Sequence, residues 1–68
     1  MKLLWRDSEE IALRLLETKR AVDPLSVRFT ELRDWVVELE EFGDDPEEVS
    51  EAKLEAIQMA WHAEFNDQ

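Results

Sequence analysis

Carboxylates are the most numerous reactive side chains in this sequence, and most of them lie in its second half. Residues 35–68 hold eleven Asp and Glu against one basic residue, Lys53, whereas residues 1–34 hold seven acids and seven bases. The formal charge of −10 therefore comes entirely from the second half. Exposed carboxylate oxygens bind hard cations such as magnesium, calcium, manganese or iron, and an acidic surface attracts a basic protein groove.

Some of these acids follow helical spacing. Four of them, at i, i+3, i+7 and i+10, predict one solvent-facing stripe on a helix. The four are Glu31, Asp34, Glu38 and Glu41, and a second stripe is expected for Glu48, Glu51 and Glu55. A solubilising face is the common interpretation of such a pattern. Nine acids with a single base in residues 38–55 repel one another, at about a few tenths of a kcal/mol for each i,i+4 pair, so we interpret this density as a sign of a partner.

Few residues in this sequence are of the types and in the arrangements that catalysis needs. The absence of cysteine excludes disulfides, thiolate zinc sites, cysteine-held iron–sulfur clusters and cysteine nucleophiles. We expect His62, the only histidine, to complement the C-terminal end of a helix. Carboxylates exposed in one acidic cluster lack the contrasting environments that separate a general acid from a general base. The prediction is a protein that is not an enzyme, and a carboxylate-based hydrolase is the least favoured alternative.

Charge and length exclude further classes. An acidic surface repels phosphate backbones, so we expect no nucleic-acid binding. No apolar run is long enough for a bilayer span or a secretory signal, so we expect no membrane association. A chain of 68 residues forms one small domain without room for a deep, enclosed pocket.

Three amphipathic helices are predicted to position the acids, at about residues 8–18, 31–42 and 50–65. The first starts with Asp7 and Glu10 in a capping-box pattern, and Pro24 breaks the chain after it. The second follows Thr30 as N-cap and ends at Gly43, the only glycine, as C′ residue.

The remaining segments are short. Val27–Phe29 alternates apolar and polar residues and predicts one brief extended segment. Residues 46–49 either join the third helix, which Ser50 caps, or form a separate turn. The predicted fold is mainly α: a compact three-helix domain over residues 1–68, with its three tryptophans on or beside inward faces.

Three segments carry a specific family resemblance. They are LLWRDSEEI (residues 3–11), DPLSVRFTELRDWVVELEEFGDDP (residues 23–46) and LEAIQMAW (residues 54–61). Together they closely resemble the IscX family, which are small acidic bacterial proteins encoded with the iron–sulfur cluster assembly machinery. The resemblance covers essentially the whole chain.

The resemblance implies a compact helical fold related to the winged helix. It also implies binding to the cysteine desulfurase IscS near its active-site entrance, in competition with bacterial frataxin, and weak iron binding by surface acids. It further implies a non-enzymatic adaptor or regulator of sulfide delivery, and we expect a cytoplasmic monomer. An iron carrier that delivers metal to the cluster scaffold is the alternative.

The candidate residues combine the family motif with the helical stripes. The acidic positions that match the motif are Asp7, Glu31, Glu38, Glu40, Glu41, Asp44, Asp45 and Glu51. The predicted partner-binding residues are Glu31, Asp34, Glu38, Glu40, Glu41, Asp44 and Asp45. The predicted ligands for weak Fe2+ or Fe3+ binding are Asp7, Glu38, Glu41, Asp44, Asp45, Glu48 and Glu51.

Two departures from the family pattern bear on these expectations. Gly43 stands where the motif can carry another Asp, which removes one possible ligand, and no EF-hand spacing is present. We therefore expect no tightly bound cofactor. Val49-Ser50-Glu51 replaces the expected Ser-Asn-Glu, which leaves the capping of the third helix to Ser50.

Overall fold

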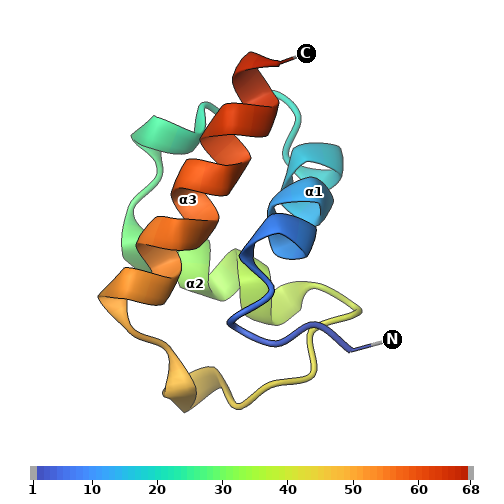
Figure 1. Cartoon of the computed structure of the whole chain (residues 1–68), viewed down its shortest axis with the longest axis vertical. Coiled ribbons are helices and arrows are strands. Elements are labelled where there is room, and N and C mark those ends of the chain that lie inside the picture. The colour runs from blue at the N-terminus through green and yellow to red at the C-terminus, as the bar shows by residue number, and fades with distance from the viewer. Residues whose placement is uncertain (1, 68) are drawn as a thin grey trace.

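Three α-helices and two short 3-10 helices make up the computed structural model, which describes residues 2–67 (Figure 1). In chain order they are α1 (Ser8–Thr18), η1 (Pro24–Ser26), α2 (Phe29–Glu38), η2 (Pro46–Glu48) and α3 (Glu51–Asn66). No strand occurs in this part of the chain, and the mainly α prediction is confirmed. None of the helices within residues 2–67 is both long and apolar enough to cross a bilayer.

The core lies where the three helices meet. In Figure 1, α3 runs beside α1, and α2 passes behind them. Ile11 of α1, Leu32 of α2 and Ile57 of α3 are completely buried. Trp61 is also fully buried and packs edge-to-face on Trp35, with 6.4 Å between ring centroids. Because the chain has no cysteine and therefore no disulfide, the stability of so small a domain depends on this apolar packing.

The segment before α1 is tied to the chain beyond α2. Leu3 donates its N–H to the carbonyl of Glu41 at 2.7 Å, and its own carbonyl accepts the N–H of Gly43 at 2.9 Å. This isolated parallel bridge joins Leu3 to Phe42. The brief extended segment predicted at Val27–Phe29 is present at Val27 and Arg28, but Phe29 is already the first residue of α2.

The second helix ends four residues earlier than expected. Leu39 leaves the helical region (φ −63°, ψ 135°), so the chain can turn and pair with Leu3. Phe42 then packs edge-to-face against Trp5 with 4.9 Å between centroids. These tertiary contacts replace the helical turn that the apolar spacing predicted through residue 42.

Gly43 consequently has a role other than the predicted C′ position. Its φ is not positive, so the left-handed conformation does not explain it. A Cβ at this position would lie 2.7 Å from the Cβ of Lys2. The glycine therefore permits the close approach of the N-terminal segment.

Two of the expected caps are also wrong. Asp7 precedes α1 as predicted, but its side chain accepts the N–H of Leu4 at 2.9 Å and caps nothing in the helix. Arg28, rather than Thr30, is the N-cap of α2, and Glu31 reaches back to the N–H of Arg28 at 3.4 Å. Ser50 does cap α3, accepting the N–H of Lys53 at 3.3 Å. Residues 46–48 form a separate turn, which resolves the alternative left open by the sequence.

Candidate functional site: exposed carboxylates of α2, η2 and α3

The exposed carboxylates between Glu31 and Glu55 form two groups. The α2 group consists of Glu31, Asp34 and Glu38 on α2 and of Glu40 just beyond its end. The η2–α3 group consists of Asp45, Glu47, Glu48, Glu51 and Glu55. All nine are exposed. The Arg33 guanidinium on α2 donates a hydrogen bond to the Pro46 carbonyl at 3.2 Å, which links α2 to η2.

Little of this negative charge is neutralised within the protein. Among the acids of residues 35–67, Glu41 alone forms an ion pair. In the α2 group, Asp34 lies 3.6 Å from its neighbour Arg33 and keeps 64% of its side chain exposed. Glu38 and Glu40 form no ion pair with any described residue. A surface of this kind keeps its field directed into solvent.

Glu41 differs from the other three members of the predicted stripe. Because α2 ends at Glu38, Glu41 lies beyond the helix and cannot continue its stripe. Its carboxylate lies 3.2 Å from Nε of Arg14 on α1, so it faces the opening half of the chain. The helical stripe of carboxylates therefore extends only from Glu31 to Glu38.

Asp44 and Asp45 shape the loop between α2 and η2. Asp44 accepts the main-chain N–H of Trp5 at 2.9 Å and that of Asp45 at 2.7 Å. The indole N–H of Trp5 donates to the carbonyl of Asp45 at 2.7 Å. The Asp45 side chain caps η2 by accepting the N–H of Glu47 at 2.9 Å. Both carboxylates thus have structural partners before any ligand arrives.

The hydrogen bond from Trp5 lowers the pKa of Asp44 from its ordinary value. The N–H of Asp45 lowers this pKa further, and the positive charges of Lys53 and Arg6 act in the same direction. Each of these contacts favours the ionised carboxylate. Asp44 therefore stays charged at neutral pH and holds the N-terminal segment against the loop.

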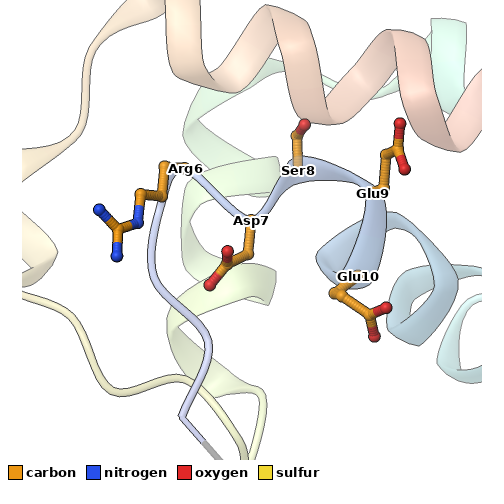
Figure 2. A pocket seen from close by; sticks show the side chains of 5 residues that line it. All are labelled: Arg6, Asp7, Ser8, Glu9 and Glu10. Carbon is orange, nitrogen blue, oxygen red and sulfur yellow. The ribbon is translucent and has the colours of Figure 1, made fainter.

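Asp7 lies apart from both groups, at the start of α1. A hollow of about 350 Å³ lies here, lined by Arg6, Asp7, Ser8, Glu9 and Glu10. Figure 2 shows that the carboxylates of Asp7, Glu9 and Glu10 point in different directions and do not converge on one point. The hydrogen bond from Leu4 further occupies Asp7.

The predicted iron ligands do not assemble a metal centre. Within residues 2–67, no three or more Asp, Glu or His side chains are arranged to hold one ion. A specific site for a hard cation needs several oxygens at fixed geometry. The arrangement offers individual surface carboxylates, which suit weak and distributed cation binding.

One feature beside the α2 group was missed by the sequence analysis. Lys19, just after α1, places its ammonium 4.8 Å from the centre of the Trp35 ring, a cation–π geometry. The two residues line a hollow of about 170 Å³ together with Glu38, Leu39 and Thr18. No local signal could have revealed it, because the contact depends on how α1 and α2 pack.

Comparison with known proteins gives a consistent result. A family model described as iron-sulphur cluster assembly matches residues 3–66. The chain is also 57% identical over 61 residues to an uncharacterized protein of Pseudomonas aeruginosa, and the match covers 90% of this chain and 92% of that protein.

Proposed function

Because this chain belongs to the IscX family of iron–sulphur cluster assembly proteins, we propose that it is a non-enzymatic adaptor that docks on a cysteine desulfurase of the IscS type. The docking surface is the α2 group, continued by the η2–α3 group. By occupying the entrance to the active site of the desulfurase, where a frataxin-like protein competes, the adaptor sets the rate at which sulfide is delivered. It acts as a monomer in the cytoplasm.

The observation that carries this proposal is the set of exposed acids without internal ion pairs. Glu38 and Glu40 are exposed, and neither is neutralised by a described basic residue. Unpaired charges of one sign accelerate the encounter with an oppositely charged partner and orient it. A face kept only for solubility would not need nine acids and a single base within 18 residues.

Iron enters the proposal as a modulator of this surface. Ferrous or ferric ions that bind weakly to the exposed carboxylates reduce the net negative charge. Since docking depends on that charge, a loaded surface attracts a basic groove less strongly. The availability of iron would in this way alter the occupancy of the desulfurase without a dedicated iron centre.

Charge reversal tests the docking surface directly. We expect Glu38→Lys with Glu40→Lys to lower the affinity for the desulfurase by about tenfold or more in a calorimetric titration, because two attractive contacts become repulsive. The matched control is Glu64→Lys with Asp67→Lys, which makes the same change in charge at exposed positions near the C-terminal end of α3, outside both acidic groups. Equal losses from the two double variants would mean that only net charge matters and would contradict a defined docking face.

A further inference from the structure

The outer seam between α1 and α3 carries a third hollow, of about 250 Å³. Its apolar lining comes from Leu13 of α1 and from Ala60 and Ala63 of α3. Its remaining lining residues are Glu9, Glu10 and Glu64. This hollow contains none of the residues assigned to the docking surface for the desulfurase.

The hollow exists because small residues face a partly exposed leucine. Leu13 lies off the buried face of α1, which consists of Ile11, Ala12 and Leu15, and 36% of Leu13 is exposed. Alanines on α3 leave the space beside it unfilled.

The charge around the hollow specifies what fits it. All the charged residues that line it are glutamates, and all are exposed. None of these glutamates forms an ion pair with a described residue. An apolar depression with an acidic rim complements a large apolar side chain flanked by positive charges.

Other occupants fit less well. A second copy of this chain would bring a charge of −10 toward an acidic rim. Anionic lipid is repelled for the same reason. The volume is below the roughly 300–1,000 Å³ typical of small-molecule pockets, but it accepts a single side chain.

We propose that the α1–α3 hollow is a second docking site, which takes a protein segment carrying a Leu, Phe or similar side chain between Lys or Arg residues. The apolar side chain enters between Leu13 and the alanines, and the basic residues pair with the glutamates of the rim. Because the two sites share no residue, the protein can hold this segment while its α2 group contacts another partner.

The test uses a short synthetic peptide, acetyl-Lys-Lys-Leu-Phe-Lys-Lys-amide, titrated into the 15N-labelled full chain. We expect chemical-shift changes centred on Leu13, Ala60 and Ala63. A second peptide with Ser in place of Leu and Phe retains the charge and should bind about tenfold more weakly, because it loses the apolar contact. Equal affinities, or shifts centred on the α2 group for both peptides, would overturn the proposal.

Variants at the hollow provide the matched comparison. Ala63→Arg fills the hollow and adds a positive charge that repels the lysines of the peptide. We therefore expect a loss of about tenfold or more in affinity for the Leu-Phe peptide. Ala52→Arg makes the same change at an exposed position near the start of the same helix and should alter affinity by less than about twofold. Glu64→Lys leaves the apolar lining intact and should weaken binding as well. Equal effects of Ala63→Arg and Ala52→Arg, in variants whose amide spectra remain dispersed, would refute the site.

Discussion

The carboxylate of Asp44 accepts a hydrogen bond from the main-chain N–H of Trp5 at 2.9 Å, across 39 residues of sequence. The Trp5 side chain is fully buried, and its indole N–H is bound by the carbonyl of the next residue, Asp45. Two hydrogen bonds from Trp5, one to Asp44 and one to Asp45, thus join the N-terminal segment to the acidic loop. An acid that the family motif suggests as an iron ligand is therefore part of the framework that gives the loop its shape.

Acid should weaken this connection in a defined pH range. The pKa of Asp44 is lowered by the fold, mainly by the Trp5 N–H, from an ordinary value of 3.8. A lowered pKa means that the ionised carboxylate stabilises the folded state at pH values above 3.8. This contribution is lost as the pH falls below 3.8 toward the pKa of the folded protein.

The measurement compares the wild-type protein with Asp44→Asn at several pH values. Unfolding in urea is monitored by tryptophan fluorescence. We expect the variant to have a lower urea midpoint at pH 7, because the side-chain amide that replaces the Asp44 carboxylate carries no charge. The difference between the two proteins should shrink as the pH falls below 3.8, because protonation of Asp44 removes from the wild-type protein the charge that the variant already lacks, whereas the other acids titrate in both proteins and cancel. A difference that stays constant over this range would contradict a charged Asp44 in the connection.

Sequence periodicity predicted much of the helical framework and less of the loops. The start and end of α1 follow from local apolar spacing, and they match the expected range. The end of α2 does not, because Leu39 leaves the helix to bring Glu41 beside Leu3. That choice depends on a contact between segments some 40 residues apart, which no local pattern contains.

The candidate site shows the same division. Helical spacing correctly placed Glu31, Asp34 and Glu38 on α2. It could not show that Glu41 pairs with Arg14 or that Asp44 binds Trp5, because both partners lie more than 25 residues earlier in the sequence. Acids that appear equivalent in the sequence thus differ in the structure: those of α2 are exposed, whereas Glu41 and Asp44 bind other residues of the protein.

A substitution at Gly43 tests the close approach of the N-terminal segment. In Gly43→Ala, the added Cβ would lie 2.7 Å from the Cβ of Lys2, so the two segments must separate. We expect a loss of about 1–3 kcal/mol in the free energy of unfolding, the usual cost of overpacking. The double variant Lys2→Gly with Gly43→Ala removes the opposing side chain and should recover much of this loss relative to Lys2→Gly alone. If the loss persists in full, the collision with Lys2 is not its cause.

The core contact between α1 and α3 is open to a similar test. Ile57 is completely buried among residues of the core. We expect Ile57→Ala to lower the free energy of unfolding by about 2–5 kcal/mol, because it removes buried methyl groups and leaves a cavity. Leu25→Ala, at a position that is 55% exposed, serves as control and should cost far less. Comparable losses in the two variants would contradict the assigned core.

Salt should distinguish electrostatic docking from apolar docking on the desulfurase. The distance over which exposed charges interact falls from about 10 Å at 0.1 M salt to about 3 Å at 1 M. We expect the affinity for the desulfurase to fall by about tenfold or more across this range, mainly through a slower association rate. Surface plasmon resonance at graded ionic strength would measure both rates, and an affinity that is unchanged at 1 M salt would contradict the proposed acidic docking surface.

Iron titration separates the adaptor from the iron carrier. Since no three acids of the described chain converge, we expect ferrous iron to broaden the amide signals of many exposed acids together, without saturation at a fixed stoichiometry. Asp44 should respond weakly, because two main-chain N–H groups already occupy its carboxylate. Citrate, a modest chelator, should reverse the broadening completely. Saturable broadening confined to a few acids, at one ion per chain and resistant to citrate, would instead establish a defined site and favour an iron carrier.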